Sequence, residues 1–441
     1  VLQKHIVMDV PARWSSSDPC CTTDVAARVV PLLASVHGRL RHPLLCRAAD
    51  LDRRRSNSVA VIACAAAGVL RTFWVAGRRH GCRACQGHAL RLVCRAAGAT
   101  PKAPPVLAQP GLEDRVQLGT LSIPALGVGT LNWPLDKDAD DPDTEDVVRR
   151  SLALGVDFFD TAEAYGFGKC ERLTSASLAK VGGSGQVATK FGPVPWRGDP
   201  DDVVRACEAS AERLGVASID LYQIHWPDVI QPLKVFGMED RKDELYWEGL
   251  ARCHQTGLAK NVGVSNYGPS MVQKAFDFFS HKGVPLASNQ FNYSLLYRKQ
   301  NSQATVDKCK ELGVTVLAYF PLVMGLLAGK YDKNTRPGGL KSFTMAKYFD
   351  GGSGIPEGGV CPLVEKLRAV AAQLGKTPAQ VALNWVICKG AVPIPGARTG
   401  QQAEDNAGAL GWRLSDEQVA ELEAVADGLG FEFSGGGFTL E

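Results

Sequence analysis

The stretch VDFFDTAEAYGFGKCERLTSASLAKVGGSGQVATKFG, residues 156–192, holds two short apolar runs, 156–162 and 186–192, on either side of an amphipathic segment at 169–180. Short apolar runs bounded by turn residues are typical of buried strands, and the spacing of apolar residues in the middle segment is typical of a helix. Parallel strands need a crossover of about a dozen residues or more, which this helix would supply. The stretch therefore predicts a βαβ unit in a parallel sheet.

The same alternation extends from about residue 115 to the end of the chain. Eight runs are expected to be strands: 123–130, 156–162, 186–192, 219–226, 259–266, 285–293, 314–322 and 391–397. Helices are expected at 142–154, 169–180, 199–214, 244–256, 269–282, 301–312 and 361–389, with an extra helix at Ser415 to Gly430. This number of alternating units is enough to close a (β/α)8 TIM barrel. An open doubly wound sheet is the alternative, but residues 127–132 do not complete the G-x-G-x-x-G turn that such a sheet normally carries.

The first 110 residues differ in composition from residues 111–441. They hold 16 Lys and Arg, five Asp and no Glu, a net charge of +11, whereas the remainder carries −8. A basic, acid-poor leader rich in Ser, Ala and Val is typical of an organelle transit peptide. We therefore expect a largely disordered, removable extension at 1–110, with its linker at 103–110, and a folded domain at 111–441.

Two patterns in this extension raise other functions. The apolar stretch Val59 to Leu70 has 12 residues, whereas a membrane-spanning helix needs about 20, so no integral span is expected. The basic run Arg53 to Arg55 could touch nucleic acid, but no aromatic residues are interleaved with it, and a solvated targeting segment is the expected interpretation.

The cysteines separate in the same way as the charges, seven before residue 110 and six after it. One cluster has ligand-like spacing and could close a small zinc loop: His80, Cys82, Cys85 and His88. No strand or helix pattern surrounds the cluster, so we expect no metal. The later six cysteines are widely scattered, and we expect reduced thiols in the core.

The segment 331–360 is rich in Gly, Pro and Lys and follows the seventh expected strand. Loops of this length in compact domains are usually lids, binding loops or disordered segments. We expect that it can fold over a ligand at the active face.

Ionisable residues occur where three neighbouring expected strands end. Asp160 and then Tyr165 follow the second strand, Lys190 the third and His225 the fourth, and in a TIM barrel these positions share the active face. A nearby cation lowers the pKa of a tyrosine, and Lys190 paired with Asp160 can provide that cation. His225 can orient a carbonyl oxygen that Tyr165 protonates as hydride arrives at the carbon.

Each of the four also has a plain structural interpretation. Asp160 could cap a helix, Tyr165 could be a loop aromatic, and Lys190 and His225 could be ordinary polar residues at strand ends. Their joint occurrence at matching strand ends favours the catalytic interpretation.

The chain resembles the aldo-keto reductases in six motifs: FDTAEAYG (159–166), ATK (188–190), QIHWPD (223–228), GVSN (263–266), NQFNYS (289–294) and AYFPL (318–322). The resemblance covers roughly residues 115–430. Within that family the chain is similar to plant and algal plastid reductases in ASNQFNYSLLYR (287–298) and IPGARTGQQAEDNAGALGW (394–412). The resemblance implies the catalytic tetrad Asp160, Tyr165, Lys190 and His225, and location in the chloroplast after removal of the leader.

The resemblance also implies an NADP(H) site. Its nicotinamide end would be formed by Thr130, Leu131, Ser265, Asn266, Gln290 and Tyr319; its pyrophosphate would lie along Pro321, Leu322 and Lys330; and its adenosine end would be held by Gly396, Arg398, Gln402 and Asn406. Arg398 would face the 2′-phosphate, because a guanidinium matches a phosphate dianion in charge and geometry. Arg398 could instead be an ordinary cation at a helix start.

The chain departs from the family pattern at four positions in this region. Phe320 stands where the family usually has Ser, and Ala328 stands where it has a hydroxyl-bearing residue, so each loses one polar contact to the cofactor. Val323 and Met324 replace residues that line the cofactor tunnel.

Three tryptophans, Trp133, Trp196 and Trp226, follow the first, third and fourth expected strands. They could line the substrate pocket or form a packed aromatic lip, and both interpretations stay open.

The expected function is reduction of aldehydes or ketones with NADPH, by a monomer or weak oligomer that acts on small molecules. The resemblance leaves one alternative, a redox-sensing regulatory protein similar to the potassium-channel β-subunits, although those relatives carry Asn where this chain has His225. Nucleic-acid binding by the leader ranks last.

Overall fold

A computed structural model of the chain describes residues 114–134, 141–228, 241–299, 301–331, 335, 347–350 and 355–433. These residues lie within one compact unit, Thr100–Glu441. The expected leader, with its candidate zinc loop and arginine run, and most of the 331–360 segment lie outside the described residues.

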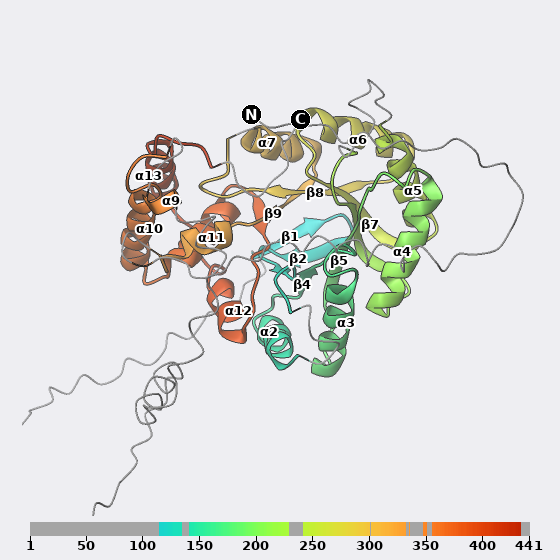
Figure 1. The fold of residues 1–441 in the computed structure, drawn as a ribbon, viewed down its shortest axis with the longest axis horizontal. Helices are drawn as coiled ribbons and strands as arrows, with labels where there is room; N and C mark the ends of the chain where they lie inside the picture. The colour runs from blue at the N-terminus through green and yellow to red at the C-terminus, as the bar shows by residue number, and fades with distance from the viewer. Residues whose placement is uncertain are drawn as a thin grey trace, which may run out of the picture. The chain divides into compact units, whose positions relative to one another are not determined.

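Eight parallel strands form one curled sheet in the order of the sequence (Figure 1). They are β3 (Val128–Gly129), β4 (Phe158–Asp160), β5 (Gln186–Phe191), β6 (Ile219–Ile224), β7 (Ala259–Ser265), β8 (Leu286–Asn292), β9 (Thr315–Tyr319) and β10 (Ala391–Pro393). The first and last strands meet where the Gly129 N–H donates to the Pro395 carbonyl and the Gly127 N–H to that of Pro393, both at 3.0 Å. Every expected strand contains an observed one, and the predicted (β/α)8 barrel is confirmed.

Helices connect the strands and surround the sheet (Figure 1): α2 (Pro142–Ala153), α3 (Lys169–Val181), α4 (Pro200–Leu214), α5 (Asp243–Gln255), α6 (Pro269–His281), α7 (Ser302–Leu312), α10 (Cys361–Leu374) and α11 (Pro378–Cys388). Local sequence sets several of their ends. Asp199 caps α4 in a reciprocal capping box with Asp202, with Pro200 at the first helical position. Gly215 ends the same helix at φ 67°, a conformation that glycine adopts without strain.

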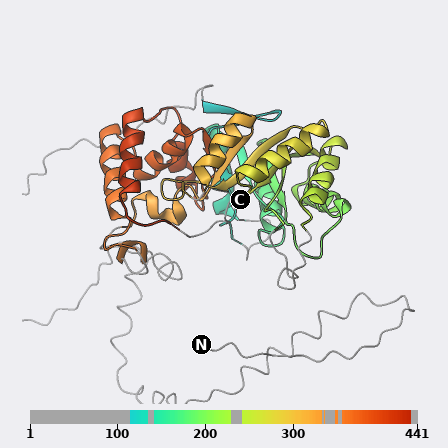
Figure 2. The ribbon, with the colours of Figure 1, turned by 90° about the horizontal axis from the view of Figure 1, so that it is seen from above.

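The expected strand 123–130 is two strands in the structure, which corrects the prediction. β2 (Leu121–Pro124) pairs antiparallel with β1 (Arg115–Leu118), and the chain turns before it enters β3. Pro124 has no N–H for a sheet ladder, which favours the end of a strand there. The hairpin lies at one end of the barrel (Figure 2, upper edge), where Leu118 and Ile123 are fully buried within a hydrophobic cluster that includes Phe158.

The expected helix 361–389 is also two elements, α10 and α11. Gly375 ends α10 at φ 64°, and Thr377 caps α11 through a capping box with Gln380. Pro378 occupies the first position of the new helix. The apolar periodicity continues from one helix into the next because both helices are buried, so the sequence pattern alone predicts a single helix. The residues Gly-Lys-Thr-Pro between them are typical of the end of one helix and the start of another.

Two short helices were not expected, the 3-10 helix η3 (Val323–Ala328) and α9 (Lys347–Asp350), and α12 (Gly400–Ala407) begins two residues after Arg398, where a helix start was one of the interpretations. The extra helix at the end of the chain is confirmed as α13 (Asp416–Asp427). α9 belongs to the 331–360 segment, and its Tyr348 is buried with its ring 4.6 Å from that of Phe433. This part of the segment is therefore packed on the C-terminal residues.

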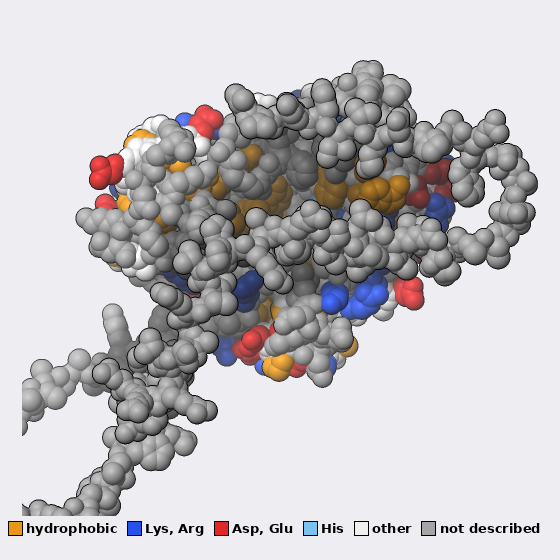
Figure 3. Space-filling view, in the orientation of Figure 1, with side chains coloured by type: hydrophobic (Ala, Val, Ile, Leu, Met, Phe, Trp, Pro, Cys, Tyr) orange, Lys and Arg blue, Asp and Glu red, His pale blue; other side chains and the backbone are white. Residues whose placement is uncertain are grey.

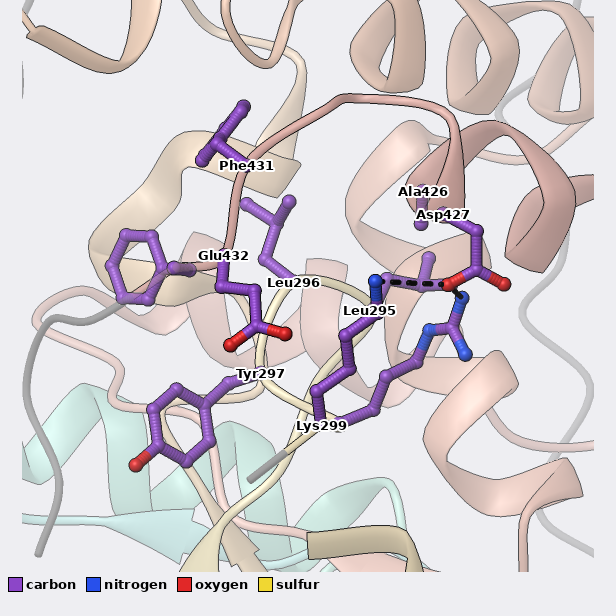
Figure 4. A pocket seen from close by; sticks show the side chains of 10 residues that line it. Leu295, Leu296, Tyr297, Lys299, Ala426, Asp427, Phe431 and Glu432 are labelled. Atoms are coloured by element: carbon purple, nitrogen blue, oxygen red, sulfur yellow. Dashed lines mark ion pairs between the residues drawn. The ribbon is translucent and has the colours of Figure 1, made fainter. Parts of the chain in front are cut away.

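Charged pairs fasten the end of α13 to the loop after β8. Asp427 accepts an ion pair from Arg298 at 2.7 Å and another from Lys299 at 3.5 Å. Figure 4 shows Lys299 and Asp427 pointing toward each other at a small pocket that is lined by residues of both segments. Because these charges are paired with one another, they hold the end of α13 against the loop after β8.

The six cysteines in the described part of the chain are free, four of them buried and two partly buried, as expected for core thiols. Within that same part, none of the helices combines the length and the apolar character that a bilayer crossing demands.

Candidate active site

The four predicted catalytic residues lie at the C-terminal end of the barrel. Asp160 is the last residue of β4, Lys190 is the penultimate residue of β5, and His225 directly follows β6. The ammonium of Lys190 lies 5.1 Å from the centre of the Tyr165 ring. The Tyr165 and His225 rings meet edge to face with centres 5.7 Å apart. The structure therefore brings all four side chains together.

Lys190 and Asp160 form a buried ion pair at the base of this group. The Lys190 ammonium, 0% exposed, donates to Asp160 Oδ2 at 2.7 Å and to the Thr161 carbonyl at 2.7 Å. The second carboxylate oxygen of Asp160 accepts from Gln290 Nε2 at 2.7 Å. Burial lowers the pKa of Lys190, while the Asp160 carboxylate opposes that shift. The ammonium is thus held in one place by fixed acceptors.

The direction expected for the pKa of Tyr165 is wrong for this structure. Burial, with a smaller contribution from the Asp160 carboxylate, raises the pKa of Tyr165 well above its ordinary value. Lys190 does not reverse the shift because Asp160 lies 2.7 Å from its ammonium and offsets that charge. Tyr165 therefore holds its proton at neutral pH and is a phenol, not a phenolate.

His225 is a neutral imidazole in this environment. Burial lowers its pKa well below the ordinary value, and the Lys190 charge acts in the same direction. Its Nδ1 atom is buried and has no hydrogen-bond partner among the described residues. A neutral ring beside a protonated phenol has one N–H to donate, which suits binding of an uncharged oxygen atom.

A second polar cluster adjoins the tetrad at the ends of β7, β8 and β9. Asn266, directly after β7, adopts φ 64°, and its Nδ2 donates to Ser265 Oγ at 3.0 Å and to the His225 carbonyl at 2.9 Å. Tyr319 donates from its hydroxyl to Asn266 Oδ1 at 2.8 Å. With Gln290 bonded to Asp160, four of the six residues expected at the nicotinamide end are hydrogen-bonded to one another or to the tetrad: Ser265, Asn266, Gln290 and Tyr319.

The residues expected at the adenosine end lie around the start of α12. Arg398 is exposed; its backbone N–H donates to Gln402 Oε1 at 2.8 Å and its Nε to the Asn132 carbonyl at 3.0 Å. Gly396 pairs with Gly129 across the closing seam, and Asn406 is buried on α12. Thr130 and Leu131 directly follow β3, so both ends of the expected cofactor site border the same seam.

The loop after β9 carries unusual backbone geometry. Phe320, Val323 and Met324 all have positive φ, at 52°, 48° and 55°. This region is costly for residues other than glycine, most of all for a β-branched residue such as Val323. Buried Pro321 and half-buried Leu322 lie inside this loop, while half-buried Ala328 and exposed Lys330 lie at its far end.

The tryptophans have different environments. Trp133 is buried, and its Nε1 donates to the Ala397 carbonyl at 3.0 Å, so it packs against the closing seam. Trp226 is half-buried; its ring lies 4.6 Å from that of His225, and its Nε1 donates to the Pro193 carbonyl at 2.9 Å. Trp196 is 82% exposed.

Two polar residues near the tetrad were not singled out from the sequence. Asn292 ends β8 on the same side of the strand as Gln290, and its Oδ1 is buried without a partner among the described residues. Glu163, two positions before Tyr165, accepts from the Gly192 N–H at 2.7 Å. The two-residue spacing in NQFNYS could have indicated Asn292, whereas the role of Glu163 depends on a loop conformation that has no simple sequence pattern.

Comparisons with known proteins agree with the barrel fold. The aldo/keto reductase family model matches residues 125–427. A chloroplastic pyridoxal reductase from Arabidopsis thaliana is 35% identical over 329 residues, which cover 71% of this chain and 86% of the relative. The solved structure of a glycerol dehydrogenase from Gluconobacter oxydans has a TM-score of 0.60 at 25% identity and covers 72% of this chain and 96% of its own. An aldo-keto reductase from Bombyx mori, solved with NADP, shares the fold with a TM-score of 0.52 at 24% identity, covering 70% of this chain and 92% of its own.

Proposed function

This chain belongs to the aldo/keto reductase family, and from that membership we propose that it reduces aldehydes or ketones to alcohols with NADPH, with Tyr165 as the general acid. The observation that carries the proposal is the convergence of a protonated tyrosine, a neutral histidine and a buried lysine–aspartate pair at one end of the barrel. Donors that converge on one point can bind a carbonyl oxygen and stabilise the charge that develops on it.

In this proposal the carbonyl oxygen of the substrate accepts hydrogen bonds from the Tyr165 hydroxyl and the His225 ring N–H. Bound NADPH would supply the hydride that adds to the carbonyl carbon. Tyr165 transfers its proton to the oxygen, which as an alkoxide would be a far stronger base than a phenolate. The Tyr165 phenolate then regains a proton from solvent, and Asp160 with Gln290 keeps the neighbouring Lys190 ammonium in place.

Residues along the closing seam fit a phosphorylated dinucleotide. Thr130 Oγ1 is buried at the end of β3 with no hydrogen-bond partner among the described residues, so it can bond to a ligand without losing an existing contact. Arg398 is exposed and lies two residues before the start of α12, whose first turn has no acidic residue. A guanidinium next to a helix N-terminus suits a phosphate, and we propose that Arg398 makes the enzyme prefer NADPH to NADH.

The remaining contacts would follow the family pattern. Ser265, Asn266 and Gln290 would hold the carboxamide, with Tyr319 against the ring and Leu131 at its edge; Pro321, Leu322 and Lys330 would border the pyrophosphate; and Gly396, Gln402 and Asn406 would border the adenosine. We also propose that residues 1–110 form a transit peptide and 111–441 a chloroplast enzyme, which the chloroplastic relative supports. The name of that relative adds pyridoxal, an aromatic aldehyde, to the candidate substrates.

The test is NADPH consumption by the full chain with a panel of aliphatic aldehydes, aromatic aldehydes including pyridoxal, and ketones, repeated with NADH. A matched control for Tyr165→Phe is Tyr222→Phe, because the Tyr222 hydroxyl is buried without a hydrogen-bond partner among the described residues. We expect turnover in the wild type and in Tyr222→Phe and its loss in Tyr165→Phe. Tight nucleotide binding with no turnover of any carbonyl would instead indicate a sensing protein.

A further inference from the structure

The loop between β5 and α4, Gly192 to Gly198, is held by hydrogen bonds at several of its residues. Pro193 and Pro195 restrict its backbone, and their carbonyls accept from Trp226 Nε1 at 2.9 Å and from Lys242 Nζ at 3.3 Å. The Tyr246 hydroxyl donates to the Arg197 carbonyl at 2.8 Å, and the Gly198 N–H donates to Asp202 Oδ2 at 2.9 Å. We call this segment the β5 loop.

One ion pair joins the β5 loop to the loop that carries Tyr165. Glu163 accepts from Arg197 through both carboxylate oxygens and also from the Gly192 N–H at 2.7 Å. Arg197 donates in addition to the Gly192 carbonyl at 3.1 Å and stacks 4.9 Å from the centre of the Phe191 ring. The side chains are mostly buried, with 14% of Glu163 and 27% of Arg197 exposed. A paired, bidentate arginine in this setting holds a defined geometry.

The polar contacts of the β5 loop leave its largest side chain in solvent. Trp196 is 82% exposed although the backbone on both sides of it is fixed. The loop is bound to Trp226, whose ring lies 4.6 Å from that of His225, so it borders the tetrad. A rigid backbone that presents an exposed tryptophan is the arrangement found at binding surfaces, since little entropy remains to be lost on contact.

Exposed apolar side chains are concentrated at this end of the barrel. Six large ones are exposed in the described part of the chain, and five follow the C-terminal end of a strand: Leu131, Phe167, Trp196, Leu245 and Met324. The sixth, Val216, precedes β6 and lies at the opposite end. Figure 3 shows hydrophobic side chains near the centre of one face. Apolar surface at the same end of the barrel as a polar site favours a ligand with an apolar body.

We propose that Glu163 and Arg197 form a latch that fixes the β5 loop beside the tetrad, and that Trp196 binds the aromatic or extended apolar part of the carbonyl substrate. This proposal rests on the proposed function and adds the substrate class to it. Glu163 and Arg197 are positioning residues, because they act through the β5 loop, and Trp196 determines specificity. A small aliphatic aldehyde would reach the tetrad without touching Trp196.

The experiment compares 2-naphthaldehyde with propanal in the wild type and in Trp196→Ala, Arg197→Ala and Arg197→Lys. We expect KM for 2-naphthaldehyde to rise about tenfold in Trp196→Ala and Arg197→Ala, as for loss of an aromatic contact, while kcat/KM for propanal changes less than about twofold. Arg197→Lys should recover part of the selectivity. The Trp196→Ala/Arg197→Ala double variant should be no more impaired than either single one, because both changes remove the same contact.

Matched controls are Val216→Ala, an exposed apolar residue at the other end of the barrel, and Arg149→Ala, whose ion pair with Asp146 lies on α2. Both should keep the wild-type selectivity. Equal losses for the two aldehydes in Arg197→Ala would show a merely structural role, and unchanged selectivity in Trp196→Ala would overturn the proposal while leaving carbonyl reduction intact.

A second readout does not require turnover. In protein labelled with 5-fluorotryptophan, the fluorine resonance of Trp196 is assigned by its absence from Trp196→Phe and is followed as 2-naphthalenemethanol is added. We expect the resonance to shift in the wild type and to shift less in Arg197→Ala. An inactive wild type with a shifting resonance would contradict only the proposed function, whereas a resonance unmoved at saturating alcohol would contradict the role of Trp196.

Discussion

Lys190→Met should destabilise the barrel by removing one partner of a fully buried ion pair. Both side chains are almost completely buried, with Lys190 0% and Asp160 3% exposed, so the variant leaves a carboxylate without its cation. Breaking a buried pair by removing one partner costs about 3–5 kcal/mol. Asp160 keeps the hydrogen bond from Gln290, so we expect the lower end, about 3 kcal/mol.

Thermal unfolding at neutral pH measures this cost. For a domain of about 320 residues, about 3 kcal/mol corresponds to a fall in Tm of roughly 4–5 °C, since the unfolding entropy is about 2.1 cal/mol/K per residue. The double variant Asp160→Asn/Lys190→Met removes both charges and should recover more than half of that loss, because no unpaired buried charge remains. Arg149→Met, in the more exposed pair with Asp146, serves as the control and should change Tm little. A Lys190→Met barrel as stable as this control would refute the reasoning.

Three further predictions concern pH, cofactor choice and packing. Because the folded-state pKa of His225 is depressed, the unfolded chain binds the extra proton below about pH 6.5, and the free energy of unfolding should fall by up to about 1.4 kcal/mol per pH unit as the pH decreases. His225→Gln should remove this part of the slope, and equal slopes for the variant and the wild type in urea titrations at several pH values would contradict the prediction. Arg398→Ala should raise KM for NADPH by about tenfold or more and leave KM for NADH within about twofold, as expected for loss of a charged contact to a phosphate. Equal effects on the two KM values would argue against a contact of Arg398 with the 2′-phosphate. Gly249→Ala should cost about 1–3 kcal/mol by overpacking, because the added Cβ would lie 2.7 Å from the Val203 Cβ on α4, and a Tm within 1 °C or so of the wild type would show that α5 can shift.

The barrel was predictable because its strands are buried and its helices are amphipathic. Runs such as residues 186–191 are short, carry Val, Ala and Phe, and lie between glycines, and eight runs of this kind at regular spacing leave few alternatives. The errors occurred where periodicity continues across a backbone break. Residues 121–129 form two strands around Pro124, and residues 361–388 form two helices around Gly375 and Pro378, so in both places the local proline and glycine signals were outweighed by the longer pattern.

The grouping of the candidate site was also predictable, since strand ends in a parallel barrel share one face. Its electrostatics were not, because the pKa of Tyr165 depends on how closely Asp160 neutralises Lys190 and on how deeply the phenol is buried. Trp133 and Trp196 look alike in sequence, as tryptophans that follow strands, yet one is packed into the closing seam and the other is in solvent. Such differences depend on the conformation of the loops, and the pairing of Glu163 with Arg197 depends on it as well.

The central claim is that Tyr165 gives its proton to the carbonyl oxygen. It is tested most directly by single-turnover kinetics, in which enzyme saturated with NADPH is mixed with an aldehyde that the wild type reduces and the decay of the reduced nicotinamide is followed. General acid catalysis contributes about 10²–10⁴-fold, so Tyr165→Phe should slow this step by at least about a hundredfold while binding NADPH as tightly as the wild type and Tyr222→Phe. A decay in Tyr165→Phe as fast as in the wild type would contradict the claim.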